Sequence, residues 1–401
     1  MRLYRIISRY PERCYFPGKE TLITPKREKC MRVRCKDYTR RDFLKGAAGT
    51  FALSTFPATF TSYGDLQQKK HFVYIKKYTS YDKNDFQQLK NCIGEMVASL
   101  YQINPFFSYG DKISLKINLV ATKDCLDLPA GDTYVTNPLV VKALGEVLLD
   151  LGAGSLFIVE GSTHPSNTME AFTELGYDVI ASQLKATLID LNKADPYPDF
   201  TQVDIERGLI YDSIAVNNHL AETDCLITVS KLKVHSSAGV TLSLKNMIGL
   251  LPIQKYGTNG TGARMQYVHS PDQRTQIPYN IVDIARVFPV DFAVIDGISA
   301  IDKGEGPWVK NISYVTPGVL VAGDNAVAVD SIGTAIMGFS PETAYPYPPF
   351  VNCYNHIQLA SSYGLGSNNL NDIAVLGEKL KDVMYPYTPP DQQRTNAKSY
   401  H

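Results

Sequence analysis

The sequence predicts an α/β protein with a mostly parallel sheet and helices on both faces. Three observations support this class. Short apolar segments with the length of strands alternate with helical segments along residues 112–338. Several of these segments are nearly continuous apolar runs, as expected for strands that are covered on both sides. Polar, charged or glycine-rich residues follow the segments, where open α/β sheets bind their ligands.

The elements follow one another in a regular order. Residues 112–120 alternate before they become apolar, which predicts a strand. Residues 138–152 place valines and leucines at helical spacing after Asn137, a suitable N-cap. A short strand is expected at residues 155–159 and a helix at 167–175. Further strands are expected at residues 186–191, 209–216, 224–229, 292–295 and 318–322, and further helices at 240–250, 280–288 and 326–337. This alternation is typical of a Rossmann-like, three-layer fold.

The charges are unevenly distributed although the formal net charge is zero. Residues 1–45 contain 14 Lys+Arg and 5 Asp+Glu, a net charge of +9, so residues 46–401 carry −9. A basic leader of this kind predicts a targeting segment rather than a binding surface. The acidic body, which lacks basic tracts, argues against a nucleic-acid partner.

A twin-arginine motif lies inside this leader. Arg40 and Arg41 are followed by Phe43-Leu44-Lys45 and by a modest apolar stretch of small residues, the order found in twin-arginine export signals. The stretch is too short and too weakly apolar for a membrane-spanning helix, and none is expected in the mature chain. We predict interaction with the twin-arginine export machinery and a periplasmic or other extracytoplasmic location. A basic amphipathic surface helix is the alternative.

Four segments are predicted along the chain. Met31 is a conventional start, so residues 1–30 are interpreted as an upstream extension that is not native, and residues 31–64 as the export signal. Residues 65–385 form the α/β domain. Residues 386–401, which contain Pro389-Pro390 and many polar side chains, are expected to be loosely packed.

The cysteines argue against an iron–sulfur cluster. Only Cys92, Cys125, Cys225 and Cys353 follow the predicted signal, and they are widely spaced without a Cys-x-x-Cys motif. Neither a cluster nor a self-contained structural zinc site is therefore expected. The identity of any cofactor, whether a metal ion or a nucleotide-derived group, stays open.

Polar residues at the ends of the predicted strands are the candidates for a site. Lys116 and Asn118 follow the first strand, Glu160 follows the second, and Asp296 follows a later one. Asp296 is a candidate catalytic acid, although a turn residue is an equally natural interpretation. Asp330 stands within an apolar helix and is expected to be a buried structural acid.

The richest segment is residues 231–250. Lys231, Lys233 and His235 precede a glycine-containing turn, and Lys245 and Asn246 follow in the predicted helix. Ammonium groups near a helix start suit phosphate or carboxylate groups, which predicts an anionic small-molecule ligand. A solvated loop with idle lysines is the alternative. Lys245 has apolar neighbours in the sequence, so it either extends to solvent or acts as a base or nucleophile.

These motifs resemble the DUF362 family. The resemblance covers residues 110–340 and rests on segments 116–118, 136–138, 231–235, 239–250, 296–297, 305–307, 326–330 and 337–338. It implies a bacterial or archaeal α/β domain whose activity is not established. Many relatives carry a ferredoxin-like iron–sulfur module, and this chain lacks the cysteines for it. The departure argues against electron transfer by this chain alone.

A second resemblance is confined to residues 235–245. His235, a following Ala-Gly pair and Lys245 are similar to a segment of nickel-pincer lactate racemases, in which a histidine and a lysine hold a nickel–pyridinium nucleotide. The resemblance implies Lys245 as the anchor, His235 as a metal ligand or acid–base group, and His164 and His269 as further ligands. A chance match of one motif is the alternative.

Three functional hypotheses follow. The first is an exported protein, with or without catalytic activity, that binds an anion through Lys116, Asn118, Glu160, Lys231, Lys233 and Asn246, with His235, Lys245 and Asp296 as catalytic candidates. The second is a non-catalytic exported binding or maturation partner of a redox system. The third is a racemase or epimerase that uses the nickel-pincer cofactor.

Overall fold

A sheet of eight strands organises the protein, in the order β14-β1-β13-β10-β7-β2-β3-β4. The computed structural model describes residues 70–78, 85–120, 133–163, 167–258, 264, 268 and 272–390, all of which belong to one compact unit, Ala52–His401. In sequence order the strands are β1 (His71–Lys77), β2 (Lys112–Ile117), β3 (Ser155–Glu160), β4 (Thr187–Asp190), β7 (Cys225–Lys231), β10 (Phe292–Gly297), β13 (Val319–Gly323) and β14 (Ile373–Gly377).

The sheet is mostly parallel, as predicted. Neighbouring strands pair in parallel from β10 through β7, β2 and β3 to β4, and β1 pairs in parallel with β14. The exception is β13, which is antiparallel to both of its neighbours, β1 and β10. The strand expected at residues 318–322 therefore exists and runs against the others.

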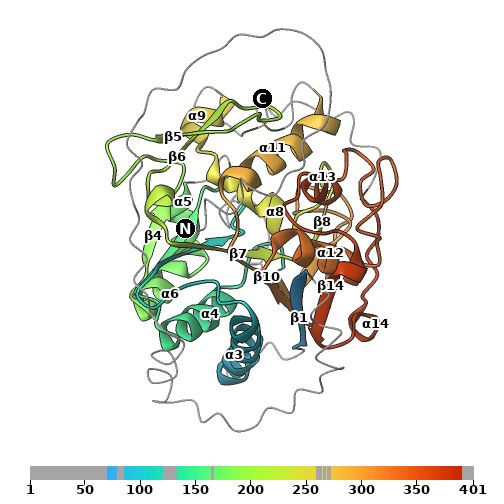
Figure 1. The fold of residues 1–401 in the computed structure, drawn as a ribbon, viewed down its shortest axis with the longest axis horizontal. Coiled ribbons are helices and arrows are strands. Elements are labelled where there is room, and N and C mark those ends of the chain that lie inside the picture. The colour runs from blue at the N-terminus through green and yellow to red at the C-terminus, as the bar shows by residue number, and fades with distance from the viewer. Residues whose placement is uncertain are drawn as a thin grey trace. The chain divides into compact units, whose positions relative to one another are not determined.

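Helices cover both faces of the sheet, which confirms the predicted layered α/β class (Figure 1). One face carries α3 (Phe86–Ile103), α4 (Pro138–Asp150) and α6 (Tyr177–Leu184). The other carries α8 (Leu242–Asn246), α11 (Gln273–Val287), α12 (Ala326–Ile336) and α13 (His356–Ser362). Among the described segments, no helix is long and apolar enough to cross a membrane.

The remaining elements are short. The helices are α5 (Thr168–Glu174), α7 (His219–Glu222), α9 (Ile253–Tyr256), α14 (Leu380–Val383) and the 3₁₀ turns η5 (Met247–Leu250) and η7 (Leu370–Asp372). Three small antiparallel sheets pair β5 (Thr201–Asp204) with β6 (Ser213–Val216), β8 (Val234–His235) with β9 (Gly239–Val240), and β11 (Ala300–Asp302) with β12 (Ser313–Val315).

Side-chain caps define where the main helices begin. Asn137 accepts the N–H of Leu139 at 2.6 Å and so starts α4, as predicted. The helix expected at residues 280–288 begins earlier, at Gln273, despite Pro278 in its interior. Proline there cannot bond the carbonyl four residues before it. That carbonyl, on Arg274, instead accepts the N–H of Tyr354 at 2.9 Å, so the helix tolerates the proline.

Two predicted elements are shorter than expected. The strand at residues 209–216 is reduced to β6, because the carboxylate of Asp283 accepts the N–H groups of residues 209, 210 and 211. These groups are then not available to a strand ladder. The helix expected at residues 240–250 starts at Leu242, because the two residues before Thr241 pair with β8.

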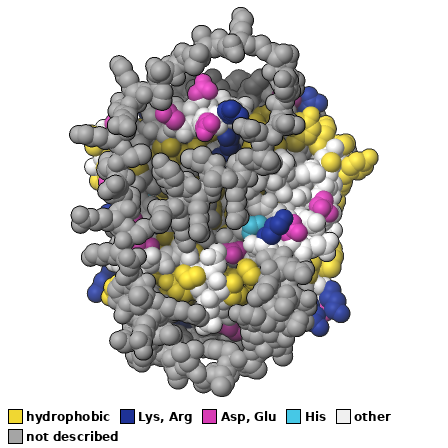
Figure 2. Space-filling view, in the orientation of Figure 1, with side chains coloured by type: hydrophobic (Ala, Val, Ile, Leu, Met, Phe, Trp, Pro, Cys, Tyr) yellow, Lys and Arg dark blue, Asp and Glu magenta, His cyan; other side chains and the backbone are white. Residues whose placement is uncertain are grey.

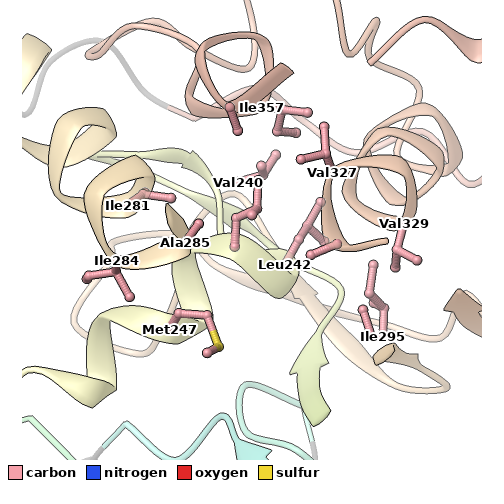
Figure 3. Packing of buried hydrophobic residues seen from close by; sticks show 14 of the residues in the cluster. Val240, Leu242, Met247, Ile281, Ile284, Ala285, Ile295, Val327, Val329 and Ile357 are labelled. Carbon is pink, nitrogen blue, oxygen red and sulfur yellow. The ribbon is translucent and has the colours of Figure 1, made fainter. Parts of the chain in front are cut away.

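Apolar side chains of the core surround the turn into α8. Val240, Leu242 and Met247 are completely buried. Figure 3 shows them among side chains of four other elements: Ile281, Ile284 and Ala285 of α11, Ile295 of β10, Val327 and Val329 of α12, and Ile357 of α13. The position of α8 is therefore fixed by close packing on the sheet face.

The start of the predicted loose tail is packed. The backbone N–H groups of Tyr385 and Tyr387 donate to carbonyls at the end of α12, and Thr388 bonds the carboxylate of Asp302. Tyr387 is buried and donates to the carbonyl of Leu232 at 3.3 Å. Loose packing is therefore wrong for residues 386–390, and residues 391–401 lie outside the described residues.

On the face that Figure 2 draws, the visible Lys and Arg side chains are dispersed among acidic and hydrophobic ones. The described part of this face therefore offers no large basic patch.

Truncating Ile295 tests the core beneath α8. Ile295→Ala should lower the free energy of unfolding by about 2–5 kcal/mol, because the packed surroundings cannot fill the cavity. Denaturation in urea measures this change. Val179→Ala, at a site on α6 that is 53% exposed, is the control and should change the value by less than about 0.5 kcal/mol. Equal losses for the two variants would contradict the central place of this core.

Candidate functional site

The carboxyl ends of four neighbouring parallel strands bring predicted polar residues to one edge of the sheet. Lys116 lies in β2, Glu160 ends β3, Lys231 ends β7, and Asp296 lies in β10. All four side chains are buried. Since this edge is where open α/β sheets bind ligands, the cluster is the candidate site.

Lys116 and Glu160 form a buried ion pair that Asn246 links to α8. Nζ of Lys116 lies 2.7 Å from Oε1 of Glu160 and also donates to a backbone carbonyl of β2. The amide oxygen of Asn246 accepts from Lys116 at 3.3 Å and from Asn118 at 3.2 Å. Its nitrogen donates to Thr228 of β7 at 2.9 Å. Burial lowers the pKa of Lys116, and attraction by Glu160 opposes this shift.

Two features of this pair bear on ligand binding. A Cβ at position 249 would collide with the Glu160 carboxylate and the Lys116 ammonium, so Gly249 is needed for the close approach. Oδ1 of Asn118 is buried and finds no donor among the described residues. A buried acceptor without a partner costs about 1–3 kcal/mol, so a donor on a ligand would suit it.

Lys231 and Asp296 form a second buried ion pair. Nζ of Lys231 lies 2.8 Å from Oδ2 of Asp296, both side chains are completely buried, and the residues are direct partners in the β7–β10 ladder. Asp296 also accepts the N–H groups of Asn137 at 3.0 Å and Ile298 at 3.1 Å. Oδ2 thus links the start of α4 to the sheet, whereas Oδ1 binds the residue that follows β10 by one position. The catalytic role of Asp296 stays a prediction.

Lys233 is buried, and no carboxylate of the described residues is bound to its ammonium. Its Nζ donates to the carbonyls of Tyr134 at 2.5 Å and Glu305 at 3.1 Å. Burial lowers the pKa of Lys233 well below its usual value, and repulsion by Lys245 adds to the shift. The two carbonyls hold this amine in one place.

Glu305 faces His235 across the β8 turn. The Glu305 carboxylate accepts three hydrogen bonds: from the N–H of Ser236 at 2.8 Å, from the Ser236 hydroxyl at 2.9 Å and from the indole N–H of Trp308 at 2.9 Å. Burial opposes ionisation of Glu305, but attraction to His235 and these hydrogen bonds outweigh it and lower the pKa to about 2. Nδ1 of His235 lies 3.9 Å from Glu305, beyond hydrogen-bond range.

The first turn of α8 is capped by a carboxylate from α12. The two oxygens of Asp330 accept the N–H groups of Ser243 at 2.7 Å and Leu244 at 2.8 Å. Leu242, just before them, has a φ of 45°, a left-handed conformation that is unusual for leucine. Burial raises the pKa of Asp330 to about 7 despite these bonds. The acid therefore fixes the backbone that leads to Lys245, in agreement with its expected structural role.

Lys245 differs from the other lysines of the site. Within the described part of the chain, its Nζ makes no hydrogen bond or ion pair, and the residue keeps some exposed surface. The ammonium is nevertheless densely surrounded, and desolvation lowers its pKa to about 8. Attraction by Glu305 opposes this shift, whereas repulsion by Lys116 and Arg264 adds to it. Lys245 thus keeps some exposed surface, and among the described residues no counter-charge is bound to its ammonium.

Four residues close enough to influence these charges were not predicted as site residues: Glu305, Arg264, Cys353 and His356. Of these four, Glu305 lies in segment 305–307, one of the segments that resemble the DUF362 family. Arg264, which is buried and donates to the carbonyl of Gly161 at 3.0 Å, stands in a stretch without an apolar pattern and gave no signal. Burial lowers the pKa of His356 to about 3, so this ring is neutral.

The predicted metal site is only partly open to inspection. His164 and His269 lie outside the described residues. Nδ1 of His235 accepts the N–H groups of Ser237 at 3.1 Å and Ala238 at 3.3 Å. Across the described ranges, no group of three or more His, Cys, Asp or Glu is placed to hold a metal ion. Metal binding by His164, His235 and His269 stays a prediction.

A pocket of about 500 Å³ lies at the opposite edge of the sheet, near the start of β1. His71, Asn325 and Asp372 are among the residues that line it. It contains none of the predicted site residues, so its position does not bear on the lysine cluster.

The fold and the edge cluster define an α/β protein with a lysine-rich site at the carboxyl ends of a mostly parallel sheet. Residues 82–335 match the family described as Domain of unknown function (DUF362). The match covers more than half of the chain, so the protein belongs to the DUF362 family, as its motifs predicted.

Individual relatives are distant. A thylakoid-associated protein of Synechocystis sp. is 23% identical over 257 residues, which cover 62% of this chain and 72% of that protein. A crystal structure of a Thermotoga maritima protein has 13% identity and a TM-score of 0.34, covering 58% of this chain and 54% of that one. The lactate racemase apoprotein of Thermoanaerobacterium thermosaccharolyticum has 12% identity and a TM-score of 0.34, covering 64% and 56%. The chain thus spans little more than half the length of either solved structure.

Removing the charge of Glu160 tests the first ion pair. Glu160→Gln should lower the free energy of unfolding by about 3–5 kcal/mol, because the Lys116 ammonium stays buried without its counter-charge. Urea denaturation provides the measurement. The double variant Lys116→Met/Glu160→Gln should recover most of the loss, since neither charge is then buried. Unchanged stability of Glu160→Gln would show that the pair is not essential.

The titration of Lys245 can be followed by its chemical reactivity. With its pKa lowered to about 8, Lys245 populates the neutral, nucleophilic amine at a lower pH than a lysine with the ordinary pKa of about 10.4. Competitive labelling with an amine reagent, read by peptide mass spectrometry, should give a half-maximal rate near pH 8 for Lys245. Exposed Lys381 of α14 is the internal control for the reagent. Parallel pH profiles for both lysines would contradict the shift.

Proposed function

We propose that this protein binds an anionic small molecule or cofactor at the carboxyl edge of its sheet, beside Lys245. The observation that carries the proposal is the Lys245 ammonium, which has no bound counter-charge among the described residues. Lys116 and Lys231, by contrast, each have a carboxylate within 2.8 Å. An anion at Lys245 would supply the missing charge.

Neighbouring groups support the same ligand chemistry. Attraction by Glu305 is the largest charge effect on the Lys245 ammonium, and it does not offset desolvation together with the repulsion by Lys116 and Arg264. A negative group bound at Nζ would stabilise the charged form of this lysine. The buried Oδ1 of Asn118 adds an acceptor for orienting a polar ligand. Lys116 and Asn118 lie at the carboxyl end of β2, the edge at which α/β sheets commonly bind ligands.

Export is part of the proposal and rests on the sequence alone. The twin-arginine motif at Arg40 and Arg41 supports delivery to an extracytoplasmic compartment, with the ligand bound there or before transport. N-terminal sequencing of protein from the envelope fraction would identify the mature start. A native peptide from residues 1–30 would contradict the assignment of that segment as an extension.

The ligand can be sought in protein purified through its own export route. Native mass spectrometry and metal analysis should find a co-purified anionic species in the wild type. Lys245→Ala should reduce its content at least about tenfold, because a charged hydrogen bond is worth about 1.5–3 kcal/mol. Lys381→Ala, a change at an exposed lysine, should retain it.

The same samples decide against the proposal in two ways. A wild-type protein without any bound species would contradict it. So would a ligand content that is unchanged in both Lys245→Ala and His235→Ala.

A further inference from the structure

Three of the four lysines at the site are held by the protein itself. Lys116 is bound to Glu160, to a backbone carbonyl and to Asn246. Lys231 is bound to Asp296, and the nitrogen of Lys233 donates to two backbone carbonyls. These three side chains are exposed by 1% or less. Burial at this level leaves a ligand in solvent without direct access to them.

Lys245 combines the opposite properties. Its Nζ has no bonded partner in the described ranges, and the residue retains exposed surface. Its backbone, however, is fixed, because Asp330 caps the helix start and the Leu242 side chain is completely buried beneath it. An amine that is not bound by neighbouring groups, on a rigid support, is the arrangement that nucleophilic lysines need.

We propose that Nζ of Lys245 forms an imine with a small anion that carries an aldehyde or ketone group, an inference that rests on the anion site proposed above. The neutral amine attacks the carbonyl carbon, a C–N bond forms, and the carbonyl oxygen becomes a hydroxyl group. The hydroxyl group leaves as water with the second proton of the amine, and a C=N bond remains. No oxidant or reductant is consumed.

The electrostatics of the site favour this step. Desolvation and the repulsion from Lys116 and Arg264 make the neutral amine accessible near pH 8, where an ordinary lysine is almost fully protonated. At pH 7.5, a pKa of about 8 leaves about a quarter of the amine neutral, against about a thousandth for an ordinary lysine. The negative group of the ligand would face the same cationic surroundings that depress the Lys245 pKa.

Reductive trapping tests the proposal. The full-length protein is incubated at pH 7.5 with cyanoborohydride and one of three probes: pyruvate, glyoxylate or 2-oxoglutarate. Hydride transfer to the imine carbon leaves a stable secondary amine, which peptide mass spectrometry locates. We expect at least one probe to modify Lys245 at least about tenfold faster than exposed Lys381. Propanoate, an anion without the carbonyl group, should give no adduct.

The variant Lys245→Arg separates this proposal from the anion site. Arginine keeps the positive charge but does not form the imine, so anion content should persist while trapping is lost. If no probe modifies Lys245 faster than Lys381 while the co-purified anion is present, the imine proposal fails and the anion site stands. If the wild type neither retains an anion nor is trapped, both fail.

Discussion

An ammonium group can be buried at a sheet edge only where protein groups replace the water around it, and this requirement shapes the site. Glu160 meets it for Lys116, and Asp296 meets it for Lys231, each at 2.8 Å or less. Two carbonyls meet it for Lys233. Asp296 of the second ion pair also accepts the N–H of Asn137 at the start of α4, so the same carboxylate neutralises a buried lysine and attaches a helix to the sheet. Lys245 is the lysine whose requirement the described protein leaves unmet.

The position of Lys245 follows from contacts on the opposite side of its helix. The carboxylate of Asp330, in the fully buried helix α12, accepts two backbone N–H groups in the first turn of α8. Leu242 has a left-handed backbone conformation, and its side chain is completely buried. The next residue along, Asn246, then orders Lys116 and Asn118 through its amide. The short helix α8 is therefore fixed by the core on one side and orders the charged residues at the sheet edge on the other.

The local sequence pattern predicted the fold class and most of the polar residues at the sheet edge, because strand ends and helix caps are recognisable from a few consecutive residues. Asn137, Lys116 and Glu160 were recognisable in this way. The pairing of Lys231 with Asp296 depends on β7 and β10 being neighbours, which no local pattern specifies. The strands β1 and β14 and the long helix α3 were not predicted. Arg264 reaches the site by loop geometry, without a periodic signal in the sequence.

The sheet can be completed only when almost the whole chain has been synthesised. Strand β1 pairs with β13 and β14, so that Val73 meets Gly323 and His71 meets Ile373, partners 250 and 302 residues apart. Pairings over such distances are slow to form. Strand β1, the first described strand after the predicted export signal, would therefore be among the last parts of the sheet to become ordered.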